Sequence, residues 1–437
     1  MKIITPSFVP PDNFDVDTFQ RKNFSSALTN VVTSTSEPLV VSLNGSWGVG
    51  KTTFIKMWQG ELWKEHTHSI YIDAFSNDHS DNAFLVVASA IIDYAKVHHA
   101  PQTGELMEKA KTIGTQLMSI GAKIALRAAT LGVLKETDIE ALEEVKDNIS
   151  ESLSDFAGSI IEEKLKSFNK DRLAIESFKA YLSELPEGLA KEGVSRPLVV
   201  IIDELDRCRP SFAVEVLEKI KHLFSVENVI FVLVINKLQI EESIRATYGS
   251  NIDAHTYLQK FISLEATLPR RKDRRSNDLK IYSELLLRLH EFPEDLRTDL
   301  AESTEKIGNH FDLTLRQLER SFSNIAIFYT ATGTHQNYHP CVVVLVCILK
   351  VASPELFNKI GGHGITYQAL EGEIGRIHEE NYPLHIATQW LRVGLMKDHE
   401  FNNLAKDDEA RHLGHRPHER QTIISRHFAP LMFFSPQ

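Results

Sequence analysis

The sequence predicts a three-layer α/β fold built on a parallel sheet, with a helical insertion and a C-terminal helical domain. Short apolar segments alternate with helical segments in two parts of the chain, which is typical of the strand–helix–strand units that build a parallel sheet. A charged stretch with helical spacing of its apolar residues and no strand pattern separates these two parts. A glycine-rich turn and, later, a pair of carboxylates follow two of the apolar segments, at the strand ends where ligands of such folds bind.

Five segments have the composition of strands. They are residues 39–43, 69–74, 198–202, 229–235 and 261–268. The third and fourth are wholly apolar, as central parallel strands are, whereas the fifth alternates and ends at a proline, as an edge strand does. Helices are expected over residues 18–32, 51–64, 81–97 and 212–224, from residue 238 onward, and over an apolar segment at residues 341–351.

The same pattern divides the chain into four parts. Residues 1–100 hold the first part of the sheet domain and residues 186–270 hold its second part. Residues 101–185 form a helical insertion, whose Glu and Lys content suits a solvated bundle or a partner surface. Residues 271–437 form the C-terminal helical domain.

The charge balance limits the classes of partner. With 59 acidic and 48 basic residues the net charge is -11, which argues against binding nucleic acid over a broad surface. Residues 269–275, PRRKDRR, form a compact basic loop, so a local contact with DNA or RNA is still possible. A solvated charged loop is the favoured interpretation, because the whole chain is acidic.

Cysteine content and the apolar segments suggest a cytoplasmic protein. The chain has 3 cysteines, an odd number and too few for a disulfide framework. The N-terminus lacks a charged segment followed by an apolar core, so we expect no secretory signal. Residues 113–134 approach the length of a membrane span, but Lys123 and Arg127 would be costly in lipid. We therefore expect a soluble helix there and no stable membrane span.

A phosphate-binding motif lies between the first predicted strand and the helix after it. Residues 45–52, GSWGVGKT, fit the pattern GxxxxGK[ST]. Main-chain N–H groups can curl around phosphate oxygens only where glycine leaves room, and the N-terminus of the next helix attracts the same anion. Lys51 is expected to reach the β- and γ-phosphates, and the hydroxyl of Thr52 to ligate Mg²⁺.

The motif therefore predicts a P-loop that binds a nucleoside triphosphate with Mg²⁺, and ATP is the favoured nucleotide. The alternative is a glycine-rich turn that only caps a helix, which the strand–loop–helix context disfavours. The expected nucleotide contacts are Gly45, Ser46, Trp47, Gly48, Val49, Gly50, Lys51, Thr52 and Thr53.

Two carboxylates follow the third predicted strand. Asp203 stands at the carboxyl end of that strand, where it is expected to hold Mg²⁺, and Glu204 is expected to act as the general base on the attacking water. By itself an acidic residue after a strand is a weak signal, because a carboxylate in an ordinary loop is the alternative. Together with the P-loop it predicts a Walker B site, because the sheet brings strand ends together.

Three further residues near the strand ends have two interpretations each. Arg207 would serve as an arginine finger in a neighbouring subunit, or form a local salt bridge with Asp206 or Glu204. Asn236 follows the fourth strand and would orient the attacking water, or cap the next helix. Cys208 is expected to be a buried packing residue rather than a nucleophile, because no histidine lies near it in the sequence.

These motifs together resemble the KAP family of P-loop NTPases. The resemblance rests on GSWGVGKT, IIDELDRC and FVLVINKLQI, with the tryptophan inside the loop and the DELDRC run as its most specific parts. The segments YLQKFI, before Pro269, and LTLRQLER, at residues 313–320, are similar to further segments of the family. The resemblance covers residues 17–324 and leaves the C-terminal part without a named relative.

The resemblance implies an additional-strand (ASCE-type) P-loop fold, in which the fourth strand separates the Walker A strand from the acidic strand. It also implies that Arg316 is a sensor arginine, although from the residues alone a solvated cation at a helix start is an equal interpretation. Glu204 stands where the family usually has aspartate, and Asn236 stands where aspartate is usual. The first departure leaves a competent base, whereas the second weakens a catalytic role.

The expected function is that of an ATPase that drives or gates a conformational or assembly switch. Its expected catalytic residues are Lys51, Glu204, Arg207, Asn236 and Arg316. Bacterial relatives are often tied to phage exclusion, so the resemblance implies a role in antiviral defence. A homo-oligomer is expected, and a separate effector protein, because the chain carries no effector motif.

Two other functions stay open at this point. One is a nucleotide-gated binding or sensor module with little turnover, which recruits an effector or nucleic acid. The other is a membrane-associated scaffold that uses residues 113–134, since many relatives carry membrane spans in the insertion. A histidine-rich C-terminal stretch is expected to face solvent or a partner rather than to bind metal. It includes His399, His412, His415, His418 and His427.

Overall fold

The computed structural model describes residues 1–4, 14, 17–80, 82–114, 173–190, 196–271, 277–333, 338–378, 380–404 and 417–434. Most of the expected helical insertion, including residues 115–134, lies outside the described residues, as do His412 and His415. The structure therefore leaves the expectation for residues 113–134 largely untested. Within the described ranges, every helix is too short or too polar to cross a bilayer.

A five-stranded parallel sheet forms the centre of the first part of the molecule, with the strand order β2-β3-β4-β1-β5. The five expected strands are all present, and β4 lies between β1 and β3, as the family resemblance implied. The strands are β1 (Leu39–Asn44), β2 (Ser69–Asp73), β3 (Leu198–Asp203), β4 (Val229–Ile235) and β5 (Leu264–Thr267). Every residue of β3 and β4 is buried, which is why both sequences are continuously apolar.

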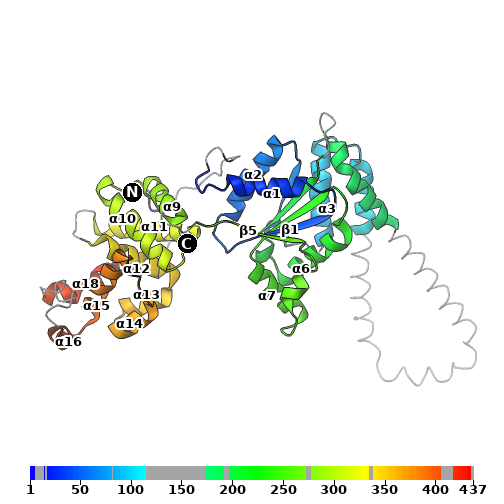
Figure 1. Cartoon of the computed structure of the whole chain (residues 1–437). Helices are drawn as coiled ribbons and strands as arrows, with labels where there is room; N and C mark the ends of the chain where they lie inside the picture. Colours follow the sequence, from blue (N-terminus) through cyan, green and yellow to red (C-terminus); the bar gives the residue numbers. More distant parts are fainter. Residues whose placement is uncertain are drawn as a thin grey trace, which may run out of the picture.

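Helices cover both faces of this sheet (Figure 1). They are α1 (Lys22–Thr33), α2 (Lys51–Lys64), α3 (Ala83–Val97), α6 (Pro210–Lys219) and α7 (Lys237–Tyr248). On β3, Val199 and Ile201 pack in one core with α1 and α2. Val200 and Ile202 pack in the other core, with α3, α6 and α7. Alternate residues of one apolar strand thus serve two opposite cores, which confirms the three-layer α/β fold.

Some element boundaries differ from those expected. The first helix begins at Lys22 rather than at residue 18, because the carboxylate of Asp17 accepts the main-chain N–H groups of Arg21 and Lys22, each at 2.8 Å. The helix after β3 ends as a π turn over Ile220–Phe224. Residues 103–114 and 173–189, at the two edges of the expected insertion, are helical.

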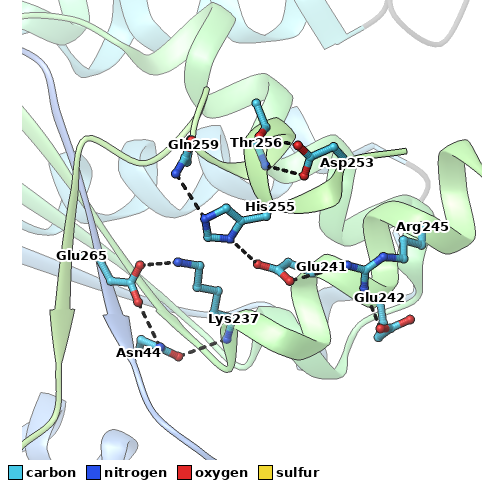
Figure 2. A network of polar contacts seen from close by, with 10 residues as sticks. All are labelled: Asn44, Lys237, Glu241, Glu242, Arg245, Asp253, His255, Thr256, Gln259 and Glu265. Atoms are coloured by element: carbon cyan, nitrogen blue, oxygen red, sulfur yellow. Dashed lines mark hydrogen bonds and ion pairs between the residues drawn. The ribbon is translucent and has the colours of Figure 1, made fainter. Parts of the chain in front are cut away.

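Edge strand β5 is tied to the sheet by side chains as well as by the ladder (Figure 2). Lys237 donates to Glu265 through Nζ at 2.6 Å, and its main-chain N–H donates to Oδ1 of Asn44 at 3.1 Å. Asn44 in turn donates to Glu265 at 3.1 Å. These contacts join the carboxyl ends of β1 and β5 to the start of α7, directly before the P-loop.

The chain after β5 is helical and forms the second part of the molecule (Figure 1). Its helices are α9 (Asp278–Leu289), α10 (Glu294–His310), α11 (Leu315–Thr332), α12 (Pro340–Ala352), α13 (Pro354–Gly361), α14 (Tyr367–Ile374), α15 (Tyr382–Leu395), α16 (Asp398–Asn402) and α18 (Pro417–Met432). A short helix, α8 (Ala254–Leu258), precedes β5. The expected apolar helix is α12, and it is buried from Cys341 to Leu349. It forms the centre of a core shared by α9, α10, α11, α15 and α18.

Candidate nucleotide-binding site

The loop between β1 and α2 has the backbone of a phosphate-binding loop. Gly48 and Gly50 have φ angles of 79° and 88°, in the region that side chains rarely adopt. A Cβ atom at Gly48 would stand 2.6 Å from Cβ of Arg316. Glycine is therefore required at Gly48 both for its backbone angle and for the close approach of α11.

Lys51 begins α2 and points back over this loop. Its Nζ donates to the carbonyl of Gly45 at 2.6 Å and to that of Ser46 at 3.3 Å. The residue is 8% exposed. Burial lowers the pKa of Lys51, and the nearby carboxylates of Asp206 and Asp203 oppose that shift. The site thus holds a desolvated ammonium group, which suits a polyphosphate ligand.

Asp203 ends β3 and faces Thr52. Its Oδ2 accepts hydrogen bonds from Oγ1 of Thr52 at 2.7 Å and from the hydroxyl of Tyr71 at 3.2 Å. Its Oδ1 accepts the main-chain N–H of Glu204 at 2.8 Å. Burial raises the pKa of Asp203, and the bonds from Thr52, Glu204 and Tyr71 oppose that shift.

The donor set fits a magnesium ion. Mg²⁺ binds hard oxygen ligands, and few from the protein, with phosphate and water completing its shell. The hydroxyl oxygen of Thr52 and a carboxylate oxygen of Asp203 lie 2.7 Å apart, so both can face one ion. These two residues are the metal ligands predicted from the sequence, and the fold brings them together from α2 and β3.

Glu204 and Arg207 lie beside this pair and contact each other. Glu204 has a φ of 59°, a left-handed conformation that turns the chain sharply at the end of β3. Its Oε1 lies 2.9 Å from Nη1 of Arg207. Burial raises the pKa of Glu204, and Arg207 lowers it. Of the two interpretations offered for Arg207, the local salt bridge is the one present in this chain.

Asn236 occupies the N-cap position of α7, but its side chain makes no capping hydrogen bond. Its main-chain N–H donates to Oδ2 of Asp206 at 2.9 Å. Cys208 is 7% exposed, and burial raises its pKa to about 12. Cys208 is therefore a protonated packing residue at neutral pH.

The loop, the acidic strand end and the helical region enclose a cavity of about 190 Å³. Lining residues that the sequence predicted are Trp47, Gly48, Gly50, Lys51, Thr52, Thr53, Asp203, Glu204, Arg207 and Arg316. Of the predicted nucleotide contacts, Gly45, Ser46 and Val49 do not line it, nor does Asn236, which was predicted as a catalytic residue.

The cavity also includes residues that sequence reasoning missed. They come from the segment before α1, from α2, from the turn after β3, and from α9 and α11: Phe14, Asp17, Thr18, Phe19, Arg21, Phe54, Met57, Asp206, Tyr282, Leu285, Leu315 and Glu319. The aromatic and aliphatic members make one part of the wall apolar, as ligand pockets commonly are. No motif pointed to them, because each is an ordinary amphipathic-helix or turn residue in its own segment.

Arg21 is the one cation in the missed group, and 5% of its surface is exposed. Its Nη2 donates to the carbonyl of Val49 in the P-loop at 3.3 Å and lies 3.9 Å from the carboxylate of Asp278. Burial lowers the pKa of Arg21 to about 10, and Asp278 opposes that shift. Arg21 thus joins the P-loop to the start of α9.

Arg316 stands at the first turn of α11, where its main-chain N–H donates to the carbonyl of Gly48 at 3.2 Å. The helix start is fixed by a capping box, in which Thr314 and Gln317 satisfy each other's main-chain N–H groups. The C-terminal helical region therefore contacts the P-loop directly, although Gly48 and Arg316 are distant in the sequence.

The weaker sequence features are placed away from the cavity or outside the described residues. In the basic loop, Arg270 is paired with Asp312 and Arg271 with Asp278, both at 3.0 Å, so these two cations bind the protein itself. Residues 272–276 lie outside the described part. Among the residues that the structure describes, no three or more His, Cys, Asp and Glu side chains form a group that could hold a metal ion.

Comparison with known proteins gives matches to a family model, to a protein sequence and to solved structures. A model described as the KAP family P-loop domain matches residues 21–332. The phage T7 exclusion protein of Escherichia coli (strain K12) is 24% identical over 364 residues, which cover 80% of this chain and 46% of that protein. The chain thus spans about half the length of that curated relative.

Solved structures of the Aeropyrum pernix ORC2 protein also match, in its ADPNP–ADP complexes and in its ADP form. The sequence identities are 13% and 14%, and the TM-score is 0.38 for both. The matches cover 86% of this chain and 80% and 78% of those chains.

The family match includes the P-loop, the acidic strand end and the helix that carries Arg316. It extends over well more than half of the 437 residues. The chain belongs to the KAP family of P-loop NTPases, and this membership indicates nucleotide binding.

Proposed function

We propose that this chain binds Mg-ATP and hydrolyses it, and that the reaction drives or gates a conformational or assembly switch. The observation that carries the proposal is the convergence of Lys51, Thr52, Asp203 and Glu204 on one cavity. Family membership supports nucleotide binding, and the intact acidic pair supports turnover.

Each residue has a defined task in this proposal. Lys51 leaves the carbonyls of its own loop and neutralises the β- and γ-phosphates. Thr52 and Asp203 hold Mg²⁺, which supplies positive charge to the phosphate oxygens when bound. Glu204 accepts a proton from the attacking water, and to do so its carboxylate must turn from Arg207 toward that water. Arg316, on α11, senses the nucleotide, so that α11 follows the state of the P-loop.

We further propose a role in antiviral defence, acting in the cytoplasm. The name of the phage T7 exclusion protein, a relative over 80% of this chain, supports the first part. All three cysteines are free, which suits a reducing compartment. Within the chain, Arg207 is paired with Glu204. We propose that the chain forms a homo-oligomer in which Arg207 leaves Glu204 and contacts the site of a neighbouring subunit. We also propose that a separate effector protein responds.

The test compares the parent protein with Lys51→Ala and Glu204→Gln. The parent is expected to release phosphate from Mg-ATP, and Glu204→Gln to retain bound, unhydrolysed ATP with its rate reduced by about 10²–10⁴. Lys51→Ala is expected to bind weakly. Glu242→Gln, on an exposed side chain of α7, is the matched control. A parent protein that binds ATP and releases no phosphate would contradict the hydrolysis proposal.

One observation favours a second function, a nucleotide-gated binding module with little turnover. Here the general base is held in an ion pair with Arg207 and the P-loop is held by α11. Such a chain would bind ATP and release α11 without hydrolysis. Single-turnover phosphate release, measured with and without a candidate effector or nucleic acid, separates the two functions.

A further inference from the structure

One buried carboxylate in the wall of the cavity joins the ends of three strands. Asp206, in the short turn Leu205–Arg207 after β3, is 8% exposed. Its Oδ2 accepts the indole N–H of Trp47 at 2.6 Å and the main-chain N–H of Asn236 at 2.9 Å. Trp47 belongs to the loop after β1, and Asn236 directly follows β4, which lies between β1 and β3.

This bridge begins where the sheet ends. The β1–β4 ladder stops at the pair Asn44 and Ile235, and the β3–β4 ladder stops at Asp203 and Val234. Beyond these pairs one main-chain bond, from the N–H of Gly45 to the carbonyl of Ile235 at 3.1 Å, ties the start of the P-loop to β4. Asn44, just before the loop, is anchored by Lys237 and Glu265 on the β5 side (Figure 2). Asp206 supplies the matching anchor on the β3 side.

The bond to Trp47 fixes the middle of the loop. Trp47 is 43% exposed, so burial alone does not hold its ring in place. A hydrogen bond from a neutral donor to a carboxylate is about twice as strong as one between neutral groups. The position of Trp47, and with it the main chain between Ser46 and Gly48, therefore depends on Asp206.

We propose that Asp206 is a positioning residue that holds the P-loop in its nucleotide-accepting form through Trp47, and couples that loop to the turn that carries Glu204 and Arg207. The inference rests on the proposed function, because it concerns the same site. When the loop moves on binding a polyphosphate, Trp47 moves Asp206, and the turn after β3 moves with it.

The test uses Trp47→Phe, which keeps a ring and removes the indole N–H, and Asp206→Asn, which keeps the shape and removes the charge. Trp63→Phe is the matched control. Trp63 is 51% exposed, belongs to α2, the helix that follows the loop, and does not line the cavity. Three measurements are made: the Kd for Mg-ATP by calorimetry, the steady-state kinetics of phosphate release (kcat and KM), and the ¹⁵N–¹H indole resonance of Trp47.

Each single variant is expected to weaken Mg-ATP binding by about tenfold, in line with the loss of one charge-assisted hydrogen bond. The double variant is expected to bind no more weakly than the weaker single variant, because both changes remove the same contact. Asp206→Asn is expected to shift the Trp47 resonance in the nucleotide-free protein. Melting temperatures report whether a variant has merely lost stability.

The proposal is overturned if Trp47→Phe binds Mg-ATP as tightly as Trp63→Phe, if the two effects add, or if Asp206→Asn leaves the Trp47 resonance unmoved. A parent that binds Mg-ATP without releasing phosphate removes hydrolysis from the proposed function, while the Kd comparison still decides the role of Asp206. A parent that binds no Mg-ATP overturns both.

Discussion

The hydroxyl of Thr52 donates a 2.7 Å hydrogen bond to the carboxylate of Asp203, across 151 positions of the chain. Thr52 lies in the first turn of α2, and Asp203 is the last residue of β3. The two strands that bring them together, β1 and β3, are separated by β4. This contact therefore places the P-loop and the acidic strand end side by side in one site.

Thr52→Ala and Thr52→Ser are expected to differ sharply. The alanine variant loses the hydroxyl that faces Asp203, so Mg-ATP binding is expected to fall by about tenfold or more and the free energy of unfolding by about 1–2 kcal/mol. The serine variant retains the hydroxyl and is expected to stay near the parent in both. Calorimetric titration with Mg-ATP and thermal melting measure the two effects. Equal binding by the alanine and serine variants would contradict a role for this hydroxyl.

Gly48→Ala is expected to destabilise the protein more than Gly333→Ala does. Both positions have a positive φ, 79° and 81°, so both variants carry a backbone cost of about 1–3 kcal/mol. A Cβ at Gly333 has nothing within 4 Å, whereas one at Gly48 meets Arg316 at 2.6 Å. The difference in melting temperature between the variants thus measures the contact of α11 with the P-loop. Similar melting temperatures would mean that α11 does not rest on the loop in solution.

Asp278→Asn is expected to cost more stability than Arg21→Met. Asp278 is buried and balances two cations, Arg21 at 3.9 Å and Arg271 at 3.0 Å. Its loss removes the stronger of the two carboxylate interactions of the buried Arg21 guanidinium and leaves Asp17 alone to balance it, at about 3–5 kcal/mol, whereas loss of Arg21 leaves Asp278 paired with Arg271. Urea unfolding measures both, with Asp93→Asn, in an exposed ion pair on α3, as a control expected to change stability by under about 1 kcal/mol. The reverse order of the two buried variants would contradict this charge balance.

His427, on α18, is expected to make the helical region sensitive to acid. Burial lowers the pKa of His427 to about 4, from an ordinary value of 6.5, so the folded protein binds this proton less tightly than the unfolded chain does. The stability is therefore complete above pH 6.5 and falls as the pH drops toward 4, by about 3 kcal/mol in total.

The variant His427→Phe tests this pH dependence. His427 packs against Phe328 and Tyr338, so a phenyl ring is expected to fit there. The variant should lose less stability than the parent between pH 7 and pH 5, as followed by thermal melting. His399→Gln, on an exposed side chain, should keep the pH dependence of the parent. An unchanged pH dependence in His427→Phe would assign the acid sensitivity to other groups.

Much of the fold and part of the site could be predicted because the responsible forces act locally. The apolar run at Val229–Ile235 could only be a buried strand or a buried helix, and its length decided for the strand. The glycines and Lys51 of the P-loop are required by the shape of a phosphate group, so their spacing is preserved in the sequence itself. The placement of β4 between β1 and β3 came from the family resemblance, because no local pattern encodes strand order.

The sequence by itself determined the layers of this protein and the chemistry of the P-loop and of the acidic strand end, since periodicity and backbone sterics act within a few residues. Only the tertiary structure decided that Arg207 engages Glu204, that Arg21 and Arg316 meet the P-loop, and that Asp206 joins Trp47 to Asn236. Each of these contacts depends on where a distant segment packs. The local sequence around a side chain does not specify which distant residue will pack against it.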